Sequence, residues 1–112
     1  MQTTDHTKCD IVLPVYNGLP YVKDCIVSLL EFTPANCYHL YIIDDYSDTV
    51  TNRYLVEQAF KHSQISLHRN SENIGFVKSC NLGISLGSAP YILLLNSDVV
   101  LTPGWLERML EC

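Results

Sequence analysis

The sequence predicts an α/β fold in which helices cover both faces of a mainly parallel sheet, a three-layer α/β/α arrangement. Short apolar runs alternate along the chain with segments whose apolar residues recur at helical spacing. The apolar runs are continuous, which is typical of parallel strands buried on both faces. The chain has 112 residues, enough for one domain. We expect this domain at 9–112, after a disordered or extended segment at 1–8, and we expect it to be truncated at its C-terminal end because the last helical pattern stops without a cap.

Strands and helices are expected to follow one another along the whole chain. Strands are expected at 9–15, 38–43, 65–69 and 91–95. Helices are expected at 20–32, 49–62, 75–86 and 104–111. The residues expected on their inner faces are Val22, Cys25, Ile26, Leu29 and Leu30 in the first helix, Leu55, Val56, Ala59 and Phe60 in the second, and Val77, Cys80 and Ile84 in the third. This order predicts βαβ units with parallel strands.

Composition and charge exclude several classes of partner. A net charge of −5 provides no basic surface for nucleic acid or anionic lipid, so we expect no nucleic-acid partner. The five cysteines lack the spacing of a metal site, and we interpret them as reduced thiols of a cytoplasmic protein. The N-terminal residues do not resemble a signal peptide, and no apolar run approaches the ~20 residues of a membrane span. Membrane association is therefore expected only through parts that this chain does not contain.

Polar, acidic and glycine residues collect directly after each predicted strand. These four segments are 14–18 (PVYNG), 44–48 (DDYSD), 70–75 (NSENIG) and 96–98 (NSD). In an open parallel sheet, ligands bind at the carboxyl ends of the strands, where the strand order reverses. We therefore predict that a ligand site lies at these strand ends.

Asp98 follows the apolar run YILLL and is a candidate metal ligand. Hard cations such as Mg²⁺ or Mn²⁺ take one or two protein carboxylates and complete their shells with water and phosphate oxygens. Such an ion would also allow an acidic chain to bind a phosphate. The alternative is that Ser97 or Asp98 caps the next turn, although Thr102 and Pro103 look like a separate helix start.

The adjacent carboxylates Asp44 and Asp45 are a second candidate. One of them is expected to have a partner, because two like charges repel. A carboxylate at this strand end could accept a hydrogen bond from a uracil or thymine ring, or from a ribose hydroxyl. The alternative is an Asx-turn that leads into the second helix, with Asp48 or Thr49 as its cap.

Two further candidates come from the first and third strand ends. Tyr16 could stack on a base, or it could pack on the core while the following residues make a turn. The helix that begins near Gly75 would point its positive end at the crevice and form an anion site. Lys78, one turn into that helix, could reach a diphosphate, or it could be an ordinary solvated lysine.

Four stretches together resemble the N-terminal, nucleotide-sugar-binding half of the family 2 inverting glycosyltransferases, which have the Rossmann-like GT-A fold. They are IVLPVYNG at 11–18, YIIDDYSD at 41–48, NIGFVKSCNLGI at 73–84 and YILLLNSDVVLTPGWLERM at 91–109. These stretches occur in the order and at the spacing of the family, and they cover nearly the whole chain.

The resemblance implies a role for each matching residue. The nucleotide-sugar-binding residues would be Pro14, Val15, Tyr16, Asn17, Asp45, Asn73, Lys78, Asn96, Ser97 and Asp98. Tyr16 would lie against the base, and Asp45 would bind the uracil or thymine ring. Asn73 and Lys78 would lie near the base and the diphosphate. Asp98 stands in the D-x-D position of the family and would bind the Mg²⁺ or Mn²⁺ that bridges the diphosphate. Asn96 replaces the first Asp of that motif and would be the second metal ligand through its carbonyl.

The resemblance also implies metal-assisted, inverting transfer of a sugar from a UDP- or dTDP-sugar to a saccharide or lipid-linked acceptor. The NSD variant is similar to the rhamnosyl and related cell-surface polysaccharide transferases. The family's catalytic base is an Asp or Glu of the C-terminal half, so we expect it beyond Cys112 and expect the fragment alone to be inactive. Two other classes stay open: a non-catalytic nucleotide-binding or interaction module, and a flavodoxin- or receiver-like domain, whose expected Asp after the third strand is missing.

Overall fold

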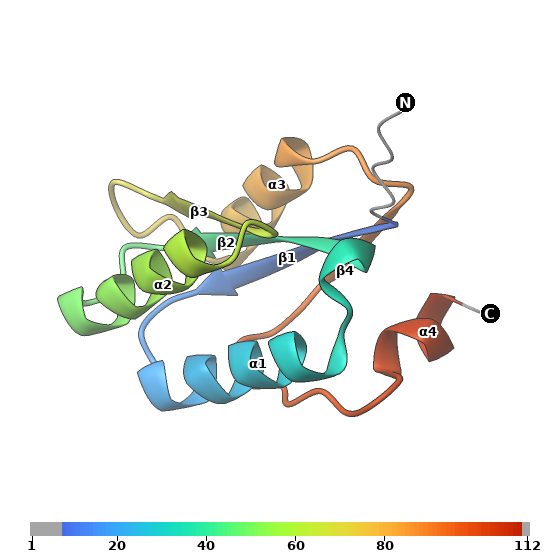
Figure 1. Ribbon diagram of the computed structural model, residues 1–112. Coiled ribbons are helices and arrows are strands. Elements are labelled where there is room, and N and C mark those ends of the chain that lie inside the picture. Colours follow the sequence, from blue (N-terminus) through green and yellow to red (C-terminus); the bar gives the residue numbers. More distant parts are fainter. Residues whose placement is uncertain (1–7, 111–112) are drawn as a thin grey trace.

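The structure is a computed structural model that describes residues 8–110 (Figure 1). The strands are β1 (Cys9–Val15), β2 (Tyr38–Asp44), β3 (Ile65–Arg69) and β4 (Tyr91–Leu94). The helices are α1 (Leu19–Phe32), α2 (Thr49–Lys61), α3 (Phe76–Leu86) and α4 (Trp105–Leu110), with a short 3₁₀ helix, η1 (Ala35–Cys37), before β2. Most of the segment predicted to be disordered or extended, 1–7, lies outside the described residues, while Lys8 donates its N–H to the Cys37 carbonyl at 3.0 Å.

The strands form one parallel sheet in the order β3-β2-β1-β4, which confirms the predicted fold class. Val15 lies opposite Asp44 in β2, and Val12 lies opposite Leu94 in β4. β2 is added beside β1 and β3 beside β2. The chain then crosses over, and β4 pairs with the opposite edge of β1. The strand order therefore reverses between β1 and β4, and in such sheets a crevice opens at the carboxyl ends of these two strands.

Helices cover both faces of the sheet, as predicted (Figure 1). On the face of α1, α2 and α4, the core includes Ile11 and Leu13 of β1, Ile26 of α1 and Trp105 of α4, all buried. The Trp105 indole N–H donates to the Thr33 hydroxyl at 2.7 Å, which ties α4 to the end of α1. Within the stripe predicted for α1, every residue is buried except Leu30, which is partly buried.

The opposite face of the sheet carries α3, which approaches closely at Gly83. A side chain at this position would overlap Val12 of β1 and come within 3.2 Å of Ile43 of β2. Glycine is therefore required for the close approach of this helix to the sheet. Val12 of β1 and Ile43 of β2 therefore point toward α3.

Two predictions of burial on the α3 side of the sheet are wrong. Val77 and Ile84, expected inward, are 68% and 37% exposed, because small residues rather than large ones form the contact face of α3. β4 is an edge strand, and its Ile92 and Leu94 are about half exposed on the side that faces α3. The prediction of burial on both faces is therefore wrong for β4.

The inner face of α2 also differs from the prediction. Its buried residues are Thr51, Leu55 and Gln58, at spacings of a helical turn. Val56 and Phe60, expected inward, are 50% and 91% exposed. α2 packs mainly against the edge strand β3, so only a narrow stripe of the helix is covered by the sheet.

Each described helix boundary agrees with the prediction to within one residue. α4 begins at Trp105, one residue later than predicted, and the Thr102 hydroxyl accepts a hydrogen bond from Arg108 instead of capping the helix. The predicted end at position 111 lies outside the described residues. None of the helices within 8–110 is long and apolar enough to cross a membrane.

Candidate functional site

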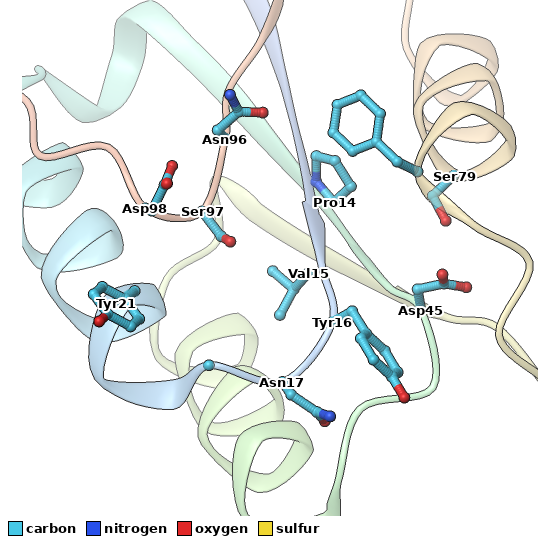
Figure 2. Close-up of a pocket in the computed structure, with 12 residues that line it drawn as sticks. Pro14, Val15, Tyr16, Asn17, Tyr21, Asp45, Ser79, Asn96, Ser97 and Asp98 are labelled. Atoms are coloured by element: carbon cyan, nitrogen blue, oxygen red, sulfur yellow. The ribbon is translucent and has the colours of Figure 1, made fainter.

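A cavity of about 370 Å³ opens at the carboxyl ends of β1, β2 and β4 (Figure 2). Its lining residues are Pro14, Val15, Tyr16, Asn17, Gly18, Tyr21, Asp45, Phe76, Ser79, Asn96, Ser97 and Asp98. All of the predicted binding residues line it except Asn73 and Lys78. The cavity therefore brings together the ends of three strands and the first turns of α1 and α3.

Tyr16 and Asn17 form the turn that leaves β1. Tyr16 is 58% exposed and lines the cavity, so the alternative in which its ring packs into the core is wrong. Asn17 has a left-handed φ of 56°, a conformation that asparagine tolerates better than most residues. Its N–H donates to the Ser47 hydroxyl and its Oδ1 accepts from the Asp48 N–H, both at 2.8 Å. These bonds join the turn after β1 to the turn after β2.

Asp45 presents a buried carboxylate to the cavity wall. Its Oδ1 accepts from Asn70 Nδ2 at 2.9 Å and from the Ile74 N–H at 2.8 Å, and its Oδ2 accepts from the Gly75 N–H at 2.9 Å. Burial by itself would raise the pKa of Asp45, but these hydrogen bonds and one from Ser79 outweigh it and hold the pKa below its ordinary value. Asp45 is therefore ionised at neutral pH and fixed in position.

The N-terminus of α3, predicted as an anion site, already receives a carboxylate of the protein. The N–H groups of Ile74 and Gly75 both donate to Asp45, so the positive end of the helix stabilises that side chain. Asn73 donates its Nδ2 to the Asp45 backbone carbonyl at 3.3 Å, and Lys78 is exposed on α3. Neither lines the cavity, and their contacts with the base and the diphosphate stay predictions.

Asp44, the neighbour of Asp45, has a structural partner. Its carboxylate is fully buried and forms an ion pair with Arg69 at 2.7 Å, while Asn52 Nδ2 donates to the same oxygen at 2.8 Å. The prediction that one of the adjacent carboxylates has a partner is confirmed. Asp48 caps α2 by accepting from the Thr51 N–H at 2.9 Å, as the alternative interpretation of this segment proposed.

The opposite wall of the cavity is formed by the segment after β4. Asn96 and Asp98 are exposed, and within the described part of the chain no hydrogen bond engages their side chains or that of Ser97. The Asn96 carbonyl accepts from the Val99 N–H at 3.2 Å and from the Cys25 thiol at 3.7 Å. Burial, and then the charge of Asp98, raises the pKa of Cys25 to about 11, so this thiol stays protonated.

The side-chain atoms on this wall that could bind a metal ion are oxygens: a carboxylate, an amide carbonyl and a hydroxyl. Residues 8–110 contain no group of three or more His, Cys, Asp or Glu that could hold a metal ion. A cation bound here would therefore take most of its ligands from water or from a bound phosphate, as Mg²⁺ commonly does.

Sequence reasoning missed Tyr21, Phe76 and Ser79, and it did not single out Gly18 within the predicted segment 14–18. Tyr21 and Phe76 are 64% and 57% exposed although both are large and aromatic. Ser79 is buried, and its hydroxyl accepts from Asn70 Nδ2 at 3.1 Å. The signal that could have found them is position, because each lies at the start of a helix that begins at the crevice.

Comparison with known proteins decides the family. The family model described as glycosyl transferase family 2 matches residues 10–111. The chain belongs to this family. An uncharacterized glycosyltransferase of Haemophilus influenzae is 27% identical over 99 residues, which are 88% of this chain and 30% of the relative. The family 2 chain spans only part of the curated relatives it matches, between 17% and 37% of their length.

Solved structures confirm the GT-A fold of this family 2 chain. The S. aureus protein TarS, in complex with UDP-GlcNAc, has a TM-score of 0.84 at 20% identity, and the match covers 94% of this chain and 30% of that one. The mannosyltransferase PcManGT from Pyrobaculum calidifontis, in complex with GDP-Man and Mn²⁺, has a TM-score of 0.84 at 16% identity, covering 93% and 31%. At these identities the likeness shows the fold alone.

Proposed function

We propose that this chain is the donor-binding part of a glycosyltransferase that uses a UDP- or dTDP-sugar. The sugar is transferred, with metal assistance and inversion at the anomeric carbon, to a saccharide or lipid-linked acceptor in cell-surface polysaccharide synthesis on the cytoplasmic side. The observation that carries the proposal is the cavity of about 370 Å³ between two different walls. One wall holds the Tyr16 ring and the ionised Asp45, and the other holds the oxygen donors of Asn96 and Asp98.

The first wall suits a pyrimidine nucleoside. An exposed ring such as that of Tyr16 can stack on any base. Asp45 can select for the ring N–H of uracil or thymine, because a carboxylate only accepts hydrogen bonds. Its own hydrogen bonds already hold that carboxylate in place, so it needs no reorganisation when a ligand arrives.

The second wall suits the diphosphate with a divalent cation. The exposed oxygens of Asp98 and Asn96 are the donors that Mg²⁺ or Mn²⁺ prefers, and these two residues would hold the ion. When bound, the ion would neutralise the charge that develops on the departing nucleoside diphosphate. The chain's net charge of −5 gives a physical reason why an anionic ligand needs such an ion.

Inverting transfer also needs a base to take the proton of the acceptor hydroxyl. The carboxylates that line the cavity within 8–110 are Asp45 and Asp98. We assign Asp45 to the nucleobase and Asp98 to the ion, so we assign no base in this chain. This observation also supports the alternative function, a module that binds a nucleotide without transferring the sugar.

Calorimetric titration of the chain with UDP, dTDP and GDP, each with and without Mn²⁺, tests the proposal. We expect UDP and dTDP to bind more tightly than GDP, and Mn²⁺ to strengthen their binding about tenfold, which corresponds to ~1.4 kcal/mol. Asp98→Asn should abolish the effect of Mn²⁺. Glu57→Gln, a carboxylate-to-amide change on the exposed side of α2, is the matched control and should leave it intact.

Absence of UDP and dTDP binding would contradict the proposal, and so would an effect of Mn²⁺ that survives in Asp98→Asn. Hydrolysis of the corresponding nucleotide sugars is measured separately, in a longer protein that contains this chain. Binding without release of sugar in that protein would favour the non-catalytic alternative.

A further inference from the structure

Ser47 lies behind the wall of the cavity that holds Tyr16 and has all of its polar groups engaged. It is 2% exposed and does not line the cavity. Its N–H donates to Asp44 Oδ1 at 2.9 Å, and its carbonyl accepts from Arg69 Nη2 at 3.1 Å. Its hydroxyl is left to accept the N–H of Asn17 at 2.8 Å. Ser47 therefore joins the partly buried Asp44–Arg69 ion pair on one side to a cavity residue on the other.

The ion pair gives Ser47 a rigid anchor. Asp44 is completely buried, and Arg69 Nη1 donates to it at 2.7 Å. The guanidinium also lies over the Tyr46 ring, at 4.9 Å from the ring centroid. Because Asp44 and Arg69 hold the N–H and the carbonyl of Ser47, the backbone of this residue is fixed beside the turn after β1. From this place its hydroxyl accepts the Asn17 N–H.

The backbone on both sides of Tyr16 is held by the segment after β2. The Val15 carbonyl accepts from the Asp45 N–H at 2.8 Å on the N-terminal side. On the C-terminal side, Asn17 bonds to Ser47 as above and also accepts from the Asp48 N–H at 2.8 Å. Tyr16 is 58% exposed, so little of it is held by surrounding side chains, and this backbone sets where its side chain starts at the cavity.

We propose that Ser47, anchored by Asp44 and Arg69, is a positioning residue that fixes the turn after β1 and so holds Tyr16 as a preformed wall for the nucleoside. The proposal rests on the proposed function for the identity of the ligand. A preformed wall does not have to be ordered when the ligand binds, which raises affinity without a new contact. Ser47 acts through Tyr16 and never touches the ligand.

A double-mutant cycle between Ser47 and Tyr16 tests whether the two residues act together. In the wild-type background, Ser47→Ala should weaken UDP binding in the presence of Mn²⁺ by about three- to tenfold, the range expected for one lost hydrogen bond. In the Tyr16→Ala background the same substitution should change the Kd by less than about twofold, because the wall it positions is gone. An equal loss in both backgrounds would overturn the proposal.

The matched control is Ser63→Ala, at an exposed position between α2 and β3, at the amino end of the sheet. It should leave the Kd for UDP unchanged. If Ser63→Ala weakens binding as much as Ser47→Ala does, the effect is not one of positioning and the proposal is wrong.

A ligand-free measurement separates this proposal from the proposed function. Amide hydrogen exchange by NMR should find the Asn17 N–H protected in the wild-type chain, and its exchange should accelerate about tenfold or more in Ser47→Ala but not in Ser63→Ala. An unprotected Asn17 N–H in the wild type would overturn the positioning role even if Ser47→Ala fails to fold. A wild-type chain that protects Asn17 but does not bind UDP or dTDP would support the fixed turn and contradict the proposed function.

Discussion

The two walls of the cavity are built in opposite ways. On the wall formed after β1 and β2, the Asp45 carboxylate and the Asn17 side chain are bonded to other parts of the protein. On the wall formed after β4, Asn96 and Asp98 are exposed and their side chains carry no hydrogen bond to the described residues. A bonded wall can select a ligand by shape, whereas a wall with free oxygens can adapt to an ion and its waters. Substitutions on the first wall should therefore affect stability, and those on the second should affect only binding.

The largest expected effect is that of Asp44→Ala, behind the first wall. The substitution removes a fully buried carboxylate and leaves Arg69 Nη1 and the Ser47 N–H without their acceptor. Breaking a buried ion pair costs ~3–5 kcal/mol, and because Arg69 is 35% exposed we expect a loss of about 2–4 kcal/mol in the free energy of unfolding. Urea unfolding checks this, with Asp24→Ala on the exposed face of α1 as the control. Equal losses for the two variants would refute the contrast between the walls.

Asp45→Asn should have a smaller effect that depends on pH. At neutral pH we expect a loss of about 1–3 kcal/mol, because the N–H groups of Ile74 and Gly75 lose a charged acceptor. The pKa of Asp45 is lowered from 3.8, so its contribution is complete above pH 3.8 and is lost as the pH falls through the lower, folded-state pKa. The stability difference between wild type and variant should therefore be constant near neutrality and shrink in acid. Urea midpoints over the acidic range measure it, and a difference that grows in acid would contradict the assignment.

Asp98→Asn, on the second wall, should leave the midpoint of urea unfolding unchanged. No hydrogen bond within 8–110 depends on this side chain, and exposed substitutions of this kind are close to neutral. The same variant should lose the strengthening of UDP binding by Mn²⁺. A clear destabilisation would show that the second wall is as tightly bonded as the first.

The smallest effect that we expect is a change in the pKa of Cys25 in Asp98→Asn. Cys25 is buried, and its thiol contacts the Asn96 carbonyl. The pKa of this thiol is raised to about 11 by burial first and by the charge of Asp98 second. Removing the charge should lower the pKa of Cys25, while burial keeps it above the ordinary value of 9.0. The Cβ chemical shift of Cys25, followed by NMR over the alkaline range, measures the change, and an unaltered titration would place Asp98 too far from the thiol to matter.

The strand ends were predictable because two sequence signals coincide there. A continuous apolar run ends abruptly in polar residues after β1, β2 and β4, and parallel pairing brings those ends to one edge of the sheet. Tyr16 and Asp98 follow from this pattern without any knowledge of packing. The pattern could not tell which carboxylate of the pair after β2 faces the cavity, since that choice depends on Arg69 at the end of β3.

Helix faces were less predictable than strand ends. Gly83 sets the approach of α3 to the sheet, so the buried face consists of the small residues Ser79, Cys80 and Gly83. The prediction that Cys80 faces inward is confirmed, whereas Val77 and Ile84 stay outside. Phe60 shows the same limit on α2, where the edge of the sheet covers only a narrow stripe. Hydrophobicity indicates which residue types tend to be buried. Which face of these two helices is buried depends on how closely the helix backbone approaches the sheet, and a single sequence does not give that distance.

Asp45 lines the cavity and also accepts from the backbone N–H groups of Ile74 and Gly75, directly before α3. These two roles constrain how the protein can change. A substitution there that alters ligand preference also loosens a helix, so the two properties cannot vary independently. Tyr21 and Phe76 line the same cavity with exposed rings, and among residues 8–110 no side-chain hydrogen bond depends on them. In laboratory evolution toward a different nucleotide, libraries at Tyr21 and Phe76 should retain more folded members than a library at Asp45. Natural divergence of ligand choice in such a scaffold would be expected to follow the same two positions.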